Sequence, residues 1–286
     1  MRPILVLILL ATMLGVQQPA TAVAEPVRVA EFLADCPYSH RLPDDPIVFP
    51  GLPGASHMHS FFGSRVTNAH TTLADLQNGA TNCNPSVDKS SYWVPTLYNG
   101  NTPVEPVITS FYYLGEGVRD DIIARTQPYP PGLRVVAGNA RATGPDSSTI
   151  ARWSCLHAGH VGASKDFVTC PSGTMLESYL DFPQCWNGRD LDSPDHKSHM
   201  AYPVGGQCPA THPVPVPKLR QVLRYPVNGD PSRFRLASGG GSPCTATSST
   251  PGPPPSWNAV SATASGRSSS AARTAVRNFP FRAGLT

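Results

Sequence analysis

The sequence predicts a mainly β protein, built as a single β-sandwich-like domain with long loops and stabilised by disulfide bonds. Proline makes up 32 of 286 residues and charged residues only 14%, which favours strands joined by ordered loops over helices. Seven cysteines without a C-x-x-C pair favour disulfides over a zinc–thiolate site. Short β-branched and aromatic runs also recur between Gly, Pro and Asn boundaries, as strands do.

The first 24 residues are expected to be a secretory signal peptide. Arg2 supplies the positive start, Ile4 to Val16 form the apolar run, and Ala22-Val23-Ala24 is a small-residue cleavage site. The apolar run is too short for a transmembrane helix, so no membrane span is expected. Residues 25–240 are then the secreted, extracellular domain.

Within that domain, the β-branched and aromatic runs predict the positions of the strands. The predicted strands cover residues 91–98, 107–114, 133–137, 151–156, 176–182 and 218–225. Residues 37–62 are expected to be extended, because their short apolar runs are separated by prolines. Only residues 71–76 and 118–124 are expected to be helical, and both segments are short.

The net charge of +3 comes from the end of the chain. Six of the 22 Lys and Arg residues follow Asp230, which leaves 16 basic against 19 acidic residues up to that point. A mildly acidic domain lacks the basic surface that nucleic-acid binding requires. No nucleic-acid partner is therefore expected.

Four of the nine histidines lie in two tight clusters. His57 and His59 occur in SHMHSFFG, and residues i and i+2 of an extended strand point to the same face. Asp195, His196 and His199 occur in SPDHKSHMAYP, and positions i and i+3 are neighbours in a single turn. Each cluster is therefore expected to bring its side chains together.

The chemistry of these clusters has three interpretations. Imidazole titrates near neutrality, so all five residues are candidate catalytic groups for proton transfer. The four histidines, His57, His59, His196 and His199, also suit a divalent metal such as zinc as a cofactor. Structural hydrogen bonding is the third interpretation, and spacing alone leaves all three open.

A second set of candidates combines aromatic rings with charged groups, as sugar-binding sites do. Paired carboxylates also suit glycoside hydrolysis. The candidate substrate-binding residues are Tyr179, Asp181, Trp186, Arg189, Asp190, Asp192 and Tyr202. The alternative is that Tyr179 and Trp186 pack in the core beside a disulfide at Cys185, while Asp190 and Asp192 cap or solvate a turn.

Four stretches resemble a family of secreted actinobacterial and fungal proteins catalogued as a domain of unknown function. They are DDPIVFPGLPGASHMHSFFG, YWVPTLY, LDFPQCWNGRDLDSPDHKSHMAYP and CPATHPVPVPKLRQVLRYPV, and the resemblance covers about Cys36 to Ser238. It implies an extracellular location and, in fungi, association with wall or carbohydrate-binding modules, but no particular reaction. The five candidate catalytic residues match family motif positions, whereas many relatives have Asp where this chain has Ser60.

After Ser238 the chain departs from the family pattern. Relatives continue with a segment like S-M-H-G-D-F-F-N-A-W, where this chain reads GSPCTATSSTPG. Codons for Ser242 to Gly252, read from the third base of each, are compatible with the family segment at every position. Residues 241–286 are therefore predicted to be an out-of-frame, disordered tail. Restoring the frame removes Cys244 and adds two cysteines, which makes the total number of cysteines even. The alternative interpretation of the tail is a genuine linker rich in Ser, Thr, Pro and Gly.

Together these features predict a secreted protein that binds or acts on a polysaccharide through a His/Asp site, with an extracellular glycan or the cell wall as its partner. A non-catalytic wall-associated protein and an inactive frameshifted copy are the alternatives. Whether the protein is an enzyme is left open.

Overall fold

The computed structural model describes residues 31–139, 145, 150–156, 163–239 and 246–249. The described chain is mainly β, which confirms the predicted fold class. The expected signal peptide lies outside the described residues.

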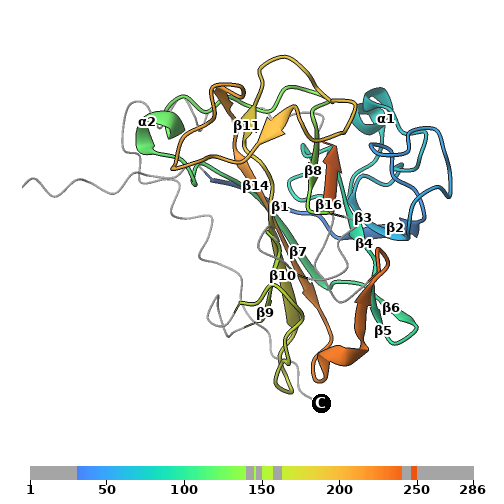
Figure 1. The fold of residues 1–286 in the computed structure, drawn as a ribbon. Helices are drawn as coiled ribbons and strands as arrows, with labels where there is room; N and C mark the ends of the chain where they lie inside the picture. Colours follow the sequence, from blue (N-terminus) through green and yellow to red (C-terminus); the bar gives the residue numbers. More distant parts are fainter. Residues whose placement is uncertain (1–30, 140–144, 146–149, 157–162, 240–245, 250–286) are drawn as a thin grey trace, which may run out of the picture.

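The first of two large sheets is antiparallel and has five strands in the order β1-β7-β14-β10-β9 (Figure 1). Its strands are β1 Glu31–Asp35, β7 Ile108–Leu114, β14 Lys218–Tyr225, β10 Leu176–Asp181 and β9 Arg152–Cys155. Four of them lie within the segments predicted from their β-branched and aromatic content. β1 was not predicted as a strand.

The second large sheet is also antiparallel and has the order β2-β3-β4-β16-β8. Its strands are β2 Tyr38–Leu42, β3 His59–Gly63, β4 Ser91–Pro95, β16 Ala246–Ser249 and β8 Arg134–Ala137. β16 lies within the predicted disordered tail, so for these four residues the structure departs from that prediction. The rest of the tail lies outside the described residues.

Smaller elements complete the domain. One three-stranded sheet contains β12 Met200–Ala201, β11 Cys185–Trp186 and β13 Val214–Pro215; the other contains β15 Phe234–Leu236, β5 Leu97–Asn99 and β6 Thr102–Val104. The helices are α1 Leu73–Asn78, α2 Asp120–Ile123 and the 3₁₀ turn η1 Pro231–Arg233. α1 begins where Thr72 and Asp75 form a capping box. In the described part of the chain, no helix has the length and apolar character needed to cross a membrane.

The two large sheets enclose the main hydrophobic core. Phe62 of β3 and Tyr92 of β4 contact Phe111 of β7, with ring centroids 6.0 and 3.8 Å apart. Since side chains alternate along a strand, Phe61 of β3 and Trp93 of β4 point to the opposite, outer face of the second sheet. There they form a smaller buried cluster with Ile47 and Val136.

We call residues 43–58, between β2 and β3, the covering loop, because they lie on this outer face. Ile47 of the loop packs against the rings of Phe61 and Trp93. Asp45 Oδ1 accepts hydrogen bonds from the backbone N–H groups of Ile47 and Val48, both at 3.0 Å. Asp44 Oδ1 accepts from Gly54 N at 2.8 Å, so two buried carboxylates fix the shape of the loop.

Three disulfides join Cys36 to Cys83, Cys155 to Cys170, and Cys185 to Cys208. They confirm that cysteines of this chain are paired as disulfides. Cys244, the seventh cysteine, lies outside the described residues.

Candidate functional site

His57 and His59 lie side by side on the outer face of the second sheet. His59 is the first residue of β3, where it is paired with Leu42 of β2 and Pro95 of β4. The two imidazole ring centroids are 4.3 Å apart, as the i and i+2 spacing predicts. His59 has no exposed surface and His57 is partly buried.

Hydrogen bonding defines the tautomer of His59. Its Nδ1 lies 2.8 Å from the carbonyl oxygen of Asp44, and a carbonyl only accepts, so Nδ1 carries the hydrogen. In the neutral ring, Nε2 is then a bare lone pair. This Nε2 atom is buried and has no hydrogen-bond partner among the described protein atoms, and the same is true of Nε2 of His57.

Both imidazoles are held in the neutral form. Burial and, to a smaller extent, the neighbouring His59 lower the pKa of His57 to about 4 against the opposing effect of Asp45. Burial also lowers the pKa of His59 to about 4, against the opposing effect of Asp44. At neutral pH the two rings therefore present unprotonated nitrogens.

The sequence analysis did not assign a role to Asp44 or Asp45, although both lie in a quoted motif. The main-chain carbonyl of Asp44 orients His59, and its side chain reaches Gly54 and, at 3.0 Å, the backbone N of Ala69. Burial raises the pKa of Asp45. Adjacent carboxylates next to a proline are also common in turns, so the sequence carried no signal that set them apart.

The second histidine cluster is bonded within the protein. His199 has no exposed surface; its Nε2 lies 2.6 Å from the carbonyl oxygen of Arg134 in β8, and its Nδ1 lies 2.9 Å from Ser193 Oγ. Since the carbonyl only accepts, Nε2 donates to it. Both ring nitrogens are thus used, and His199 attaches its loop to the edge strand β8.

His196 and Asp195 also make local contacts. His196 has a left-handed backbone with φ 58°, and its Nδ1 lies 3.1 Å from Asp192, which pairs with Arg134 at the same distance. Asp195 Oδ1 accepts from the backbone N of Ser198 at 2.8 Å and from other groups of the same turn, which lowers the pKa of Asp195. These contacts stabilise the turn.

The structure does not bring the two clusters into one ligand set. β3 and β8 are separated by β4 and β16, so they lie three strand spacings, about 14 Å, apart. Among the described residues, the only group of three close His, Cys, Asp or Glu donors is Cys36, Cys83 and Asp88. A metal centre that combines the two clusters is therefore not formed by the described residues.

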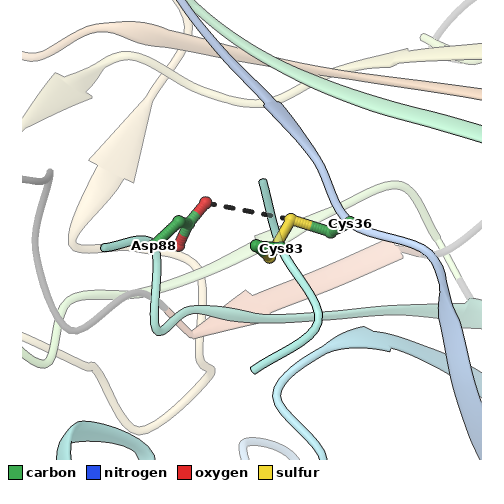
Figure 2. A group of neighbouring side chains, drawn as sticks. All are labelled: Cys36, Cys83 and Asp88. Atoms are coloured by element: carbon green, nitrogen blue, oxygen red, sulfur yellow. Dashed lines mark hydrogen bonds between the residues drawn. A yellow bond between two sulfur atoms is a disulfide. The ribbon is translucent and has the colours of Figure 1, made fainter. Parts of the chain in front are cut away.

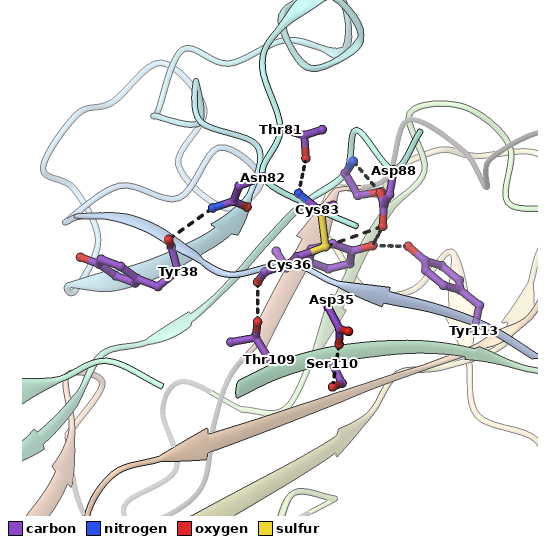
Figure 3. Close-up of a disulfide and its surroundings, with 12 residues drawn as sticks. Asp35, Cys36, Tyr38, Thr81, Asn82, Cys83, Asp88, Thr109, Ser110 and Tyr113 are labelled. Atoms are coloured by element: carbon purple, nitrogen blue, oxygen red, sulfur yellow. Dashed lines mark hydrogen bonds between the residues drawn. A yellow bond between two sulfur atoms is a disulfide. The ribbon is translucent and has the colours of Figure 1, made fainter. Parts of the chain in front are cut away.

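The Cys36, Cys83 and Asp88 group is a structural cluster (Figures 2 and 3). The two sulfurs are bonded to each other, so neither is a thiolate that could bind a metal. Asp88 Oδ2 accepts a hydrogen bond from the Tyr92 hydroxyl at 2.6 Å, which in turn lies 2.6 Å from the Tyr113 hydroxyl. Burial raises the pKa of Asp88 and, strongly, those of both tyrosines.

The predicted sugar-binding residues are divided between two places. Tyr179 and Asp181 lie on β10 of the first sheet, and the Tyr202 hydroxyl donates to the carbonyl of Asp181 at 2.9 Å. The Asp181 carboxylate pairs with Arg220 at 2.7 and 2.9 Å. Tyr179 donates to Glu177.

The other four residues of this set lie at and after β11. Trp186 Nε1 donates to the carbonyl of Asp190 at 2.6 Å, and the Asp190 side chain pairs with the exposed Arg189 at 2.8 Å. Asp192 contacts Arg134 and His196, as described above. Each of the seven residues has a partner within the protein. The His57–His59 pair differs from them, because its two Nε2 atoms are buried and have no hydrogen-bond partner among the described residues.

Comparison with curated proteins and with solved structures gave no match. A family profile matches residues 45–248, which is most of the chain and includes both histidine clusters. The chain belongs to the family described as Domain of unknown function (DUF1996).

Proposed function

We propose that the protein is secreted and that it binds and acts on an extracellular polysaccharide at the outer face of the second sheet. The observation that carries this proposal is the pair of adjacent imidazole rings of His57 and His59, whose buried Nε2 atoms have no hydrogen-bond partner among the described residues. Buried polar groups in folded proteins almost always have partners, and exceptions often serve a function. Three disulfides, which persist in oxidising compartments, support the extracellular location.

The unprotonated state of the pair permits proton abstraction. An unprotonated imidazole can accept a proton from a sugar hydroxyl or from water, the step that begins hydrolysis or elimination. His57, partly buried, is the member of the pair closer to the surface, and His59 lies beneath it. The substrate would therefore meet His57 first, and His59 would act with it.

A cleft of about 500 Å³ near the covering loop supports the choice of a polysaccharide. It is lined by Val66, Asn68, His70, Thr71, Ala74, Asp75, Asn78 and Gly79. Its volume suits a few sugar residues. Backbone hydrogen bonding links its wall to the loop, since Gly51 N donates to the Ala69 carbonyl at 2.7 Å.

This cleft also favours a second candidate function, non-catalytic binding of wall glycan. In that case the cleft holds the glycan, and the histidine pair only supports the covering loop. The two candidates differ in one respect, because only the first requires the imidazoles for turnover.

The test is a binding and cleavage screen against plant, fungal and bacterial wall polysaccharides, with the His59→Ala and His199→Ala variants beside the unmodified protein. We expect the His59→Ala variant to fold and to lose cleavage activity. We expect the His199→Ala variant to have a lower free energy of unfolding, because His199 is bonded within the protein. If the unmodified protein binds a polysaccharide without cleaving it, the result would support the non-catalytic function. Absence of both binding and cleavage would refute the proposal.

A further inference from the structure

The unpartnered nitrogens of His57 and His59 raise a question of their own: what binds them. The bare Nε2 atom of His59 is an acceptor, and the Nε2 atom of the neighbouring His57 also has no hydrogen-bond partner among the described residues. Leaving a buried polar group without a partner costs about 1–3 kcal/mol, so two such groups on neighbouring rings favour a bound partner at this place. The partner must be a hydrogen-bond donor or a cation.

The geometry around His59 favours a cation. Histidines that bind metals almost always donate the second ring N–H to a carbonyl or a carboxylate, which orients the ring. His59 Nδ1 makes this contact with the Asp44 carbonyl at 2.8 Å. The rest of the ring is packed in the protein, since His59 has no exposed surface, so its Nε2 atom has a fixed direction.

The charges near the pair also favour a cation. The carboxyl groups of Asp44 and Asp45 belong to the covering loop beside the pair, and both are buried. The main-chain carbonyl of Asp44 contacts His59 directly. Acidic groups of this loop would favour a positive ion over a neutral donor.

We propose that His57 and His59 bind one transition-metal ion of the copper and zinc class through their Nε2 atoms. Imidazole nitrogen is a preferred ligand for these metals, and hard ions such as Mg²⁺ and Ca²⁺ prefer oxygen. No third His, Cys, Asp or Glu donor of the described residues completes the set. Catalytic zinc sites have three protein ligands and one open position; two protein ligands would leave further positions for water or for a sugar hydroxyl.

The inference deepens the proposed function, because it places a metal at the same histidine pair, but it can be tested without any polysaccharide. The full chain is stripped of metal with a chelator and titrated with Cu²⁺ and, separately, with Zn²⁺. Calorimetry measures the stoichiometry, and electron paramagnetic resonance of the Cu²⁺ sample reports nitrogen ligands. We expect one ion per chain and a signal from two imidazole nitrogens.

Three variants decide where the ion binds. His59→Ala and the less buried His57→Gln should each weaken binding at least tenfold, and His57→Gln keeps the test decisive if His59→Ala fails to fold. His196→Gln is the matched control, because His196 is a partly buried imidazole outside the pair, as His57 is partly buried, and this variant should leave the affinity within twofold. Equal affinity in the unmodified protein and in a folded His57→Gln variant would overturn the inference, as would absence of stoichiometric binding.

The metal and the proposed function can fail separately. Metal binding without any effect on polysaccharide would refute the function and leave the metal site in place. If the metal-free protein cleaves polysaccharide at an unchanged rate, the metal takes no part in catalysis. Proton transfer by the imidazoles would then be the remaining mechanism.

Discussion

The two histidine clusters look alike in sequence and differ in the structure. His57 and His59 are adjacent on one sheet face, and each has a buried Nε2 atom without a partner. In the second cluster, His199 uses both ring nitrogens within the protein and His196 contacts Asp192. Short histidine motifs therefore indicate convergence of side chains, and the hydrogen bonds distinguish the proposed binding pair from a cluster bonded within the protein.

The largest expected effect is on stability, at His199. His199→Ala truncates a buried side chain and removes two hydrogen bonds, one of them to the Arg134 carbonyl, so it should lower the free energy of unfolding by roughly 3–5 kcal/mol. His59→Ala removes one hydrogen bond, to Asp44, and should cost about 1–2 kcal/mol less. Urea unfolding of the two variants measures the difference.

An equal loss in both variants, or a larger loss in His59→Ala, would contradict the comparison. In that case His59 would contribute at least as much as His199 to the free energy of unfolding. The interpretation of its unpartnered nitrogen as a binding group would then be wrong.

A second prediction concerns strand β16, which lies between β4 and β8 and therefore between the two clusters. It reads Ala-Thr-Ser-Ser, although Ser248 is paired with Tyr92 and Val135, both of which are buried. The predicted restored frame would place D-F-F on this strand. A chain expressed in the restored frame should have a free energy of unfolding higher by roughly 2 kcal/mol, since one buried Phe contributes about that much.

Sequencing the gene comes first in this test, because the neighbouring frame must encode the M-H-G-D-F-F run. Its absence would end the frameshift prediction. If the run is present but the restored chain is no more stable, the tail does not complete the second sheet.

The smallest expected effect is at Asp181, which the sequence assigned to sugar binding and the structure places in an ion pair with Arg220. Asp181→Asn should cost about 1 kcal/mol of unfolding free energy and leave polysaccharide binding unchanged. A large loss of binding in the folded variant would return Asp181 to the functional residues.

The same carboxylate gives a pH test. Burial acts to raise the pKa of Asp181, but the hydrogen bond from Arg220 and the charge of Lys218 outweigh it and lower the pKa. A lowered folded-state pKa stabilises the protein above the unfolded pKa of about 4, and this stability is lost as the pH falls further. The difference between the protein and Asp181→Asn should therefore shrink below pH 4, as acid unfolding at several pH values would show.

The strands were largely predictable, because their residues carry local signals. The segment 218–225 coincides with β14, and 107–114 includes β7, since both are rich in β-branched or aromatic residues. The predicted helix 71–76 is shifted in the structure to Leu73–Asn78, because Thr72 caps it. β1, Glu31–Asp35, has only a short apolar run, and its pairing with β7 depends on distant residues.

The site was predictable in part. The i and i+2 spacing correctly predicted that the His57 and His59 rings meet. It could not predict the distance to His199, because that depends on the strand order, with β4 and β16 between β3 and β8. Nor could it show that the Asp44 carbonyl orients His59, since main-chain contacts follow from the fold of the covering loop.

The most direct test of the central claim compares His57→Gln with His196→Gln, since both side chains are partly buried and neither belongs to the main core. The measurement is the rate of polysaccharide cleavage by the two folded variants. We predict at least a hundredfold loss for His57→Gln and a rate within twofold of the unmodified protein for His196→Gln. Equal losses, or a larger loss for His196→Gln, would contradict the account.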